Sequence, residues 1–338
     1  MEDVRLIIGI FSDVALEHAT GEALLRARTK TDDLPPTIWL SKVTKPYMII
    51  FDAGTPKDYV NIQKCEEYGV SIARGTADVR ELRSVIYRDM NSWEVHFFDY
   101  TTSPLLSADF NANHALFSKI MINFFAGFGI SARLEGNNLM VGDKKIGYSD
   151  PKILYKNRIF WYDSNVLQDF PFDIVKQLYG ISPENLPTPE RITTLKRELG
   201  KYVPDKEVIA RIKASFQSVF ISTPLEGELT DLEKEIRDKA YAKHSDSEWI
   251  LQGDTILKRA RLHKKSLFRL ETHLTLHGEM SDYFRPVTRY CQIICPFYQE
   301  CVAQTVPAKT VKDQLEFCRR IANSLPGDIV EAIEILEV

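Results

Sequence analysis

Residues 134–147 read LEGNNLMVGDKKIG, and this stretch is the most informative in the chain. Two short strand patterns, residues 139–141 and 144–147, are separated by Gly142-Asp143, which is typical of a tight hairpin turn. The second strand carries Lys145 close to a glycine. A lysine fixed in this way can approach an anionic oxygen and neutralise the charge that grows on phosphorus when a carboxylate attacks an α-phosphate. A solvated hairpin edge that discourages sheet aggregation is the alternative interpretation of the lysine pair.

The segments around this hairpin predict a mixture of strands and helices. Residues 93–100 alternate apolar side chains with Glu94 and His96, which predicts a strand with one buried face. Residues 111–127 form the most apolar helical pattern and end in a glycine. Because tight turns join several neighbouring strands, the pattern favours an α+β fold over strict βαβ repetition.

The polar residues 229–243 mark the predicted domain boundary. They contain Glu233 and Arg237 at i,i+4 spacing and predict a solvated connector helix. We therefore predict a large domain over residues 1–245. Residues 246–338 begin with strand pattern and finish with helical pattern, which predicts a small α+β domain at the C-terminus.

The charge balance limits the classes of partner. The 338 residues include 43 Lys and Arg against 47 Asp and Glu, which gives a formal net charge of −4. Without a basic excess, we expect neither nucleic acid nor a membrane surface as partner. No apolar run is long enough to cross a bilayer, and acidic residues stand where a signal peptide would be basic. The expected compartment is the cytoplasm.

The hairpin sequence resembles the lysine motif of the lipoate–protein ligases, within the biotin/lipoate ligase superfamily. Further segments resemble the same family in the same order, namely residues 14–28, 37–61, 65–70, 85–98 and 229–249. The resemblance implies a mixed-sheet catalytic domain like that of the biotin and lipoate ligases, followed by the small α+β accessory domain. It also implies that MgATP activates lipoate, or a related medium-chain acyl acid, to an acyl-adenylate.

The resemblance implies roles for individual residues. Lys145 would hold the lipoate carboxylate and the α-phosphate, with Gly147 in the same binding site. Asn137 and Asn138 stand where the family binds ATP and its magnesium. The region of the lipoyl tunnel and the adenylate would be lined by Tyr87, Asp89 and Asn91. The acyl group would then pass to a lysine of a lipoyl carrier domain, of the 2-oxoacid dehydrogenase E2 type or the glycine-cleavage H protein type.

One loop departs from the family pattern. The family's substrate loop is rich in glycine, whereas residues 74–84 contain Gly75 as their one glycine. Side chains therefore fill space where bare backbone would approach the acyl-adenylate. Arg74, Arg80 and Arg83 offer forked donors that suit phosphate oxygens. A surface loop balanced by acidic side chains is the alternative.

These departures leave two alternatives to a ligase. A catalytically altered paralogue would bind a lipoyl group or a lipoyl carrier without adenylation. An ATP-independent octanoyl or lipoyl transferase would need a cysteine nucleophile in the catalytic domain, where Cys65 is the one cysteine. Because Cys65 lies in a predicted helix, we expect it in the core.

Four of the five cysteines fall near the C-terminus, namely Cys291, Cys295, Cys301 and Cys318. Four thiolates can hold zinc or an iron–sulfur cluster. The spacing does not match the common Cys-x2-Cys knuckles, so ordinary core cysteines are the alternative.

Overall fold

The computed structural model of the chain describes residues 4–50, 60–75, 85–154, 158–180, 187–220 and 223–252. All of these belong to the first of two units into which the chain divides, Met1–Gly253 and Asp254–Val338. The four C-terminal cysteines, Arg80, Arg83 and the predicted accessory domain from residue 253 onward lie outside the described residues. The predicted domain boundary after residue 245 stays a prediction.

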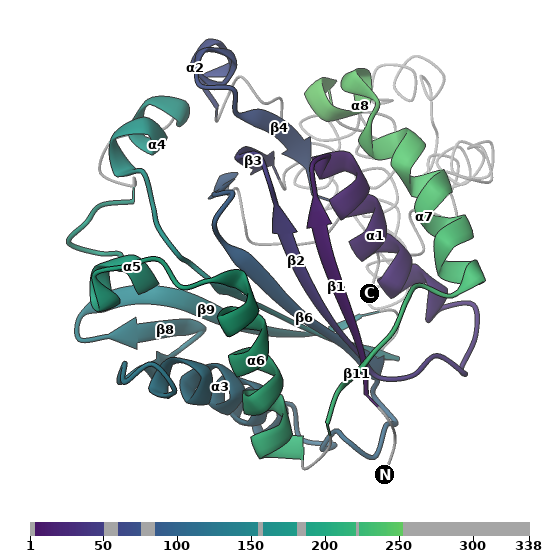
Figure 1. Cartoon of the computed structure of the whole chain (residues 1–338). Helices are drawn as coiled ribbons and strands as arrows, with labels where there is room; N and C mark the ends of the chain where they lie inside the picture. Colours follow the sequence, from purple (N-terminus) through teal and green to yellow (C-terminus); the bar gives the residue numbers. More distant parts are fainter. Residues whose placement is uncertain are drawn as a thin grey trace, which may run out of the picture. The chain divides into compact units, whose positions relative to one another are not determined.

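The described strands form a large mixed sheet in the order β11-β1-β2-β6-β10-β9-β8-β7 (Figure 1). Its strands are β1 (Arg5–Phe11), β2 (Thr37–Val43), β6 (Trp93–Tyr100), β7 (Arg133–Glu135), β8 (Asn138–Val141), β9 (Lys144–Leu154), β10 (Ile159–Val166) and β11 (Leu225–Glu226). β1 pairs in parallel with β2 and β11, and the other pairs of this sheet are antiparallel. The mixed sheet confirms the predicted α+β class.

A smaller sheet has the order β4-β3-β5 and contains β3 (Tyr47–Ile50), β4 (Ser71–Arg74) and β5 (Val85–Arg88). Pro46 lies between β2 and β3, where the chain leaves the large sheet. The helices α2 (Ile62–Glu67) and α4 (Phe172–Leu178) contribute side chains to the same apolar cluster as β3. Cys65 is buried in this cluster, which confirms its expected place in the core.

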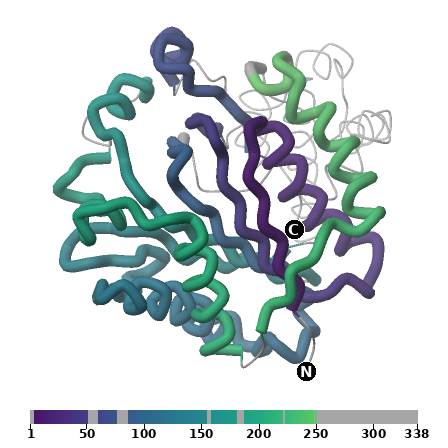
Figure 2. The backbone as a smooth tube through the Cα atoms, viewed as in Figure 1, coloured from purple at the N-terminus to yellow at the C-terminus, as the bar shows by residue number. Residues whose placement is uncertain are grey.

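Helices cover both faces of the large sheet. On one face, α3 (Phe110–Ala126) and α6 (Asp205–Phe220) pack against β6, and the ring centroids of Phe97 and Phe117 are 4.8 Å apart. On the other face, α1 (Val14–Ala27) packs Leu24 against Trp39 and Phe98. α7 (Asp231–His244) lies beside α1, as the purple and green tubes of Figure 2 show. The remaining helices are α5 (Leu195–Leu199) and α8 (Ser247–Gln252).

Two predictions about exposure are wrong for the same physical reason. β6 is buried on both faces, with Glu94 and His96 only 3% and 6% exposed, because α1 covers the face that we expected to be solvated. The helix expected as a solvated connector, α7, also packs against α1 and buries Glu233 and His244. No helix of the described residues is long and apolar enough to cross a membrane.

Candidate active site

Lys145 is held by backbone pairing on two sides. The predicted hairpin is confirmed, since β8 and β9 pair across a turn in which Gly142 has a φ of 55°. On its other side, the Lys145 amide donates to the Arg191 carbonyl (2.9 Å), and the Thr193 amide donates to the Lys145 carbonyl (2.9 Å). This pairing fixes the point from which the lysine side chain projects.

The Lys145 ammonium group has an unusual environment for a lysine. Its side chain is half-buried, and no hydrogen bond or ion pair joins Nζ to any residue that the structure describes. Nζ lies 5.9 Å from the centroid of the Tyr148 ring. Burial lowers the pKa of Lys145, and the charge of Asp150 opposes that shift. A cation in this state gains more from an anionic ligand than a fully hydrated lysine does.

Gly147 shapes the strand next to Lys145. The pairing of β8 with β9 shifts between Leu139 and Met140, so β9 carries one extra residue at Ile146. Such a bulge changes the direction of the neighbouring side chains. A Cβ at Gly147 would lie 3.0 Å from the Asn165 carbonyl oxygen. The glycine is therefore required by the close approach of the chain to Asn165.

Asn137 and Asn138 lie at the tip of the preceding turn and are exposed. Asn137 donates from Nδ2 to Asp150 (3.0 Å), and its carbonyl accepts from the Ser149 amide (2.9 Å). Asp150 also forms an ion pair with Lys152 (2.7 Å). The turn thus presents amide oxygens beside the middle of β9.

Tyr87 lies on β5, and Asp89 and Asn91 follow in the turn that leads to β6. Tyr87 is buried, packs edge-to-face on Phe170, and burial raises its pKa. Asp89 is buried too and accepts from the Asn91 amide (3.1 Å), and burial raises the pKa of its carboxyl group. Among the described residues, no hydrogen bond or ion pair joins these three side chains to Lys145.

Arg74 and Cys65, two further residues considered from the sequence, are both buried. Arg74 is buried, and its guanidinium donates to the carbonyls of Trp249 and Ile250 at 3.0–3.2 Å. It therefore holds the segment of α8 against β4. Burial raises the pKa of the Cys65 thiol to about 11, so the thiolate that a transferase needs is disfavoured.

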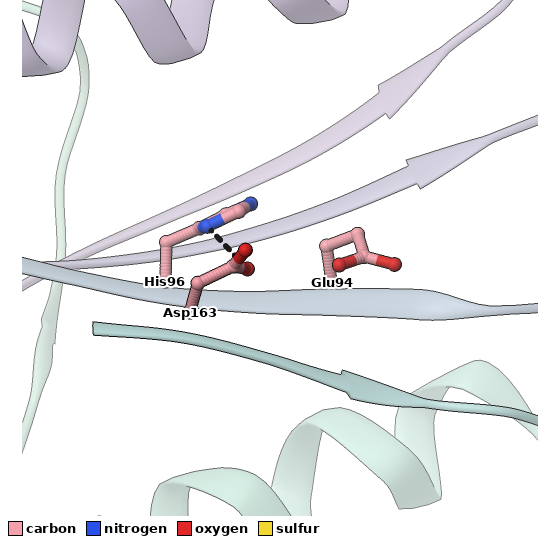
Figure 3. Close-up of side chains that lie close together, drawn as sticks. All are labelled: Glu94, His96 and Asp163. Carbon is pink, nitrogen blue, oxygen red and sulfur yellow. Dashed lines mark ion pairs between the residues drawn. The ribbon is translucent and has the colours of Figure 1, made fainter. Parts of the chain in front are cut away.

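A buried acid–base cluster lies on the face of the large sheet that α1 covers. We define it as Glu17, Arg88, Glu94, His96, Tyr148 and Asp163. Arg88 forms an ion pair with Glu94 (2.9 Å) and lies 3.6 Å from Glu17. His96 Nδ1 lies 3.1 Å from Asp163 Oδ1, as the dashed line in Figure 3 marks.

Tyr148 connects this cluster to the candidate lysine. Its hydroxyl oxygen lies 2.8 Å from Glu94 Oε2 and 3.0 Å from Asp163 Oδ1. A tyrosine hydroxyl carries one hydrogen, so it cannot donate a full hydrogen bond to both carboxylates. Because the Tyr148 ring also lies beneath Lys145 Nζ, the cluster and the lysine form one connected region.

The two carboxyl groups that Tyr148 contacts differ in acidity. Burial raises the pKa of Glu94 to about 8, although the charge of Arg88 opposes this. Burial alone would raise the pKa of Asp163 as well, but the charge and hydrogen bond of His96 hold it at about 2. One proton therefore stays with Glu94 at neutral pH while Asp163 is ionised.

This cluster was not predicted from the sequence. The available signal was the pair Glu94 and His96 at alternate positions of an otherwise apolar strand. Asp163 lies 67 residues after His96 in the chain, and it pairs directly opposite His96. Only the register of β6 with β10 brings the three side chains together.

Comparisons with known proteins place the fold. No family model matches the sequence, and no curated protein matches it. Among solved structures, a bipartite lipoate protein ligase of Thermoplasma acidophilum, studied with its E2 lipoyl domain, matches with a TM-score of 0.63. It has 15% identity, over 75% of this chain and 98% of that chain.

Two further structures match. Lipoate-protein ligase A bound with ATP has a TM-score of 0.62 and 16% identity, over 75% of this chain and 100% of that chain. The Plasmodium falciparum ligase LipL1 in complex with lipoate has a TM-score of 0.56 and 16% identity, over 75% of this chain and 74% of that chain. The described part of this chain therefore has the fold of the lipoate–protein ligases.

Proposed function

We propose that this protein is an ATP-dependent ligase that activates lipoate, or a related medium-chain acyl acid, and transfers the acyl group to a lysine of a lipoyl carrier domain. The observation that carries the proposal is the half-buried Lys145 ammonium group, which forms no hydrogen bond or ion pair with the described residues. The similar folds include one bound with ATP, one in complex with lipoate and one studied with an E2 lipoyl domain.

In this mechanism Lys145 stabilises the negative charge that develops on the phosphoryl oxygens. The acyl carboxylate attacks the α-phosphorus of ATP and displaces pyrophosphate, and negative charge increases on the phosphoryl oxygens. Lys145, already partly desolvated, stabilises that charge more in the transition state than a hydrated lysine would. The carrier amine then attacks the acyl carbon and displaces AMP. A backbone fixed on both sides keeps the ammonium group in position through both steps.

The exposed turn at Asn137 and Asn138 fits a magnesium ion that arrives with the nucleotide. Mg²⁺ prefers oxygen ligands and keeps several waters, and amide side chains at an exposed turn are compatible with that preference. The ion would neutralise phosphate charge there. Orientation of the acyl carboxylate would remain with Lys145.

A second candidate function has one observation in its favour. Arg74 stands at the start of the loop that lacks the family's glycines, and its guanidinium is bonded to the carbonyls of α8. A phosphate-binding role would require that contact to break. This favours the catalytically altered paralogue, which binds a lipoyl group or carrier without adenylation.

The deciding experiment follows the mass of a lipoyl carrier domain incubated with ATP, lipoate and the full-length protein. We expect the mass gain of one lipoyl group, and we expect Lys145→Met to lower its rate by about 100-fold or more. Lys144→Met, at the neighbouring exposed position, is the matched control and should retain the activity. Full activity in Lys145→Met would contradict the mechanism. If the wild type gives no mass gain and calorimetry shows lipoate binding without ATP binding, the paralogue is supported.

A further inference from the structure

Glu94, His96 and Asp163 bring three potential metal ligands together in the buried core. The pleat places Glu94 and His96 on the same face of β6, two residues apart, and Asp163 pairs opposite His96 on β10. One ligand atom from each side chain lies within 4.8 Å of the others (Figure 3). The positions of these three side chains are therefore fixed by the register of β6 with β10, and not by a flexible surface segment.

The separations suit a bound ion. Two ligands at right angles around a cation, each roughly 2.1 Å away, are about 3.0 Å apart. His96 Nδ1 and Asp163 Oδ1 are separated by 3.1 Å. Within the part of the chain that the structure describes, neither Glu94 Oε1 nor Asp163 Oδ2 accepts a hydrogen bond. Each carboxylate thus retains an unused oxygen, and His96 Nδ1, which faces Asp163 and lies 3.4 Å from Trp161 Nε1, is the imidazole nitrogen that the ion would take.

The charge of the cluster also favours a bound cation. Glu17, Glu94 and Asp163 are three buried or nearly buried carboxyl groups, and among the described residues Arg88 is the guanidinium that pairs with them. The nearby Lys152 is already paired with Asp150. The Tyr148 hydroxyl meets two of the carboxyl groups with a single hydrogen. Uncompensated negative charge in a buried site is costly and attracts either protons or a cation.

We propose that Glu94, His96 and Asp163 bind one divalent first-row cation, of the kind that accepts one imidazole nitrogen and two carboxylate oxygens. Glu94 releases its proton when the ion binds, and a charge of +2 then balances the two carboxylates in excess of Arg88. Arg88 keeps its ion pair with Glu94 through Oε2, which leaves Oε1 for the ion. Tyr148 holds both carboxylates from the other side. This ion is additional to any metal that accompanies ATP.

Manganese is the probe for the test, because Mn²⁺ favours oxygen and nitrogen ligands, whereas the C-terminal cysteines would prefer zinc. Full-length protein, stripped of metal and free of nucleotide, is titrated with Mn²⁺ and followed by electron paramagnetic resonance. We expect one bound ion per chain, and we expect Asp163→Asn and His96→Gln each to weaken binding by at least about tenfold, since even outer partners of a metal contribute that much.

Glu22→Gln is the matched control, because Glu22 is another buried carboxylate bonded to a histidine, at 2.8 Å from His244. It should retain Mn²⁺ binding. Thermal unfolding gives a second readout, since an ion that binds the folded state raises the Tm of the wild type and of Glu22→Gln but not of Asp163→Asn. Absence of binding in the wild type, or equal binding by Asp163→Asn, would overturn the proposal.

Discussion

Glu94 is an acid and Lys145 is a base, but burial destabilises the ionised form of both side chains. Lys145 is only half-buried and no described residue pairs with it, so its ammonium group stays available to a ligand. Glu94 is nearly fully buried beside Arg88 and Tyr148, and it retains a proton to about pH 8. The same sheet thus supports an available cation and a protonated acid that contact one tyrosine, the cation at the ring of Tyr148 and the acid at its hydroxyl group.

The raised pKa of Glu94 predicts a dependence of stability on pH. Its folded-state pKa of about 8 exceeds the ordinary value of 4.5, so its contribution to stability is complete below pH 4.5 and is lost as the pH rises through 8. Without added metal, we expect the free energy of unfolding in urea to fall between pH 5 and 8.5. Glu94→Gln should flatten this fall, whereas Glu135→Gln, on the exposed hairpin, should leave it unchanged. Parallel profiles for wild type and Glu94→Gln would contradict the assignment.

At the scale of elements, the β8–β9 hairpin depends on a small number of local features. Gly142 adopts the positive φ that the turn requires, and the bulge at Ile146 separates the pairing of Lys145 from that of Gly147. Segment 191–193 then pairs with the outer side of Lys145. The hairpin follows from local sequence, whereas the second pairing requires a segment more than 40 residues later.

Gly147→Ala tests this arrangement. The added methyl group would lie 3.0 Å from a backbone oxygen of Asn165, which cannot move as a flexible side chain would. We expect a loss of about 1–3 kcal/mol in the free energy of unfolding, as is usual for overpacking, and a displaced Lys145. Lys144→Ala, on the same strand but exposed, is the control. The free energy of unfolding in urea and the rate of mass gain on the carrier domain should both decrease. Unchanged stability would show that β9 tolerates the methyl group.

At the scale of the whole described unit, α7 is joined to elements from the start of the chain. Arg5 on β1 pairs with Glu233 (2.6 Å), and Glu22 on α1 binds both Lys243 and His244 (2.7 and 2.8 Å). Thr230 caps the helix and forms a capping box with Glu233. These contacts connect residues more than 220 positions apart and explain why a polar helix is buried on one side.

The Glu22 contacts predict how this packing responds to acid. Burial alone would raise the pKa of Glu22, but the hydrogen bond from His244 and the charge of Lys243 lower it to about 2. Its stabilisation is therefore complete above pH 4.5 and is lost as the pH falls through 2. We expect Glu22→Gln to cost up to about 3 kcal/mol at pH 7 and less at pH 3. Chemical unfolding at both pH values checks this, with the exposed Glu235→Gln as control. An equal cost at pH 3 would show that packing, and not charge, dominates.

The sequence by itself determined the local structure of this protein. The Gly-Asp turn, the alternation in β6 and the apolar α3 each depend on residues close in the chain, where periodicity and turn chemistry act directly. The order of segments also led to the lipoate–protein ligase fold. The roles of Asn137, Asn138, Tyr87, Asp89 and Asn91 stay predictions, as do those of Arg80, Arg83 and the C-terminal cysteines.

Only the tertiary structure decided which polar side chains are buried. Alternation in β6 shows that Glu94 and His96 share a face, but not that α1 covers it, because coverage depends on contacts between distant segments. The strand register that places Asp163 opposite His96 and the packing that places Arg88 beside Glu94 have the same origin. Burial then raises the cost of charge, and this turns ordinary surface residue types into an acid–base cluster.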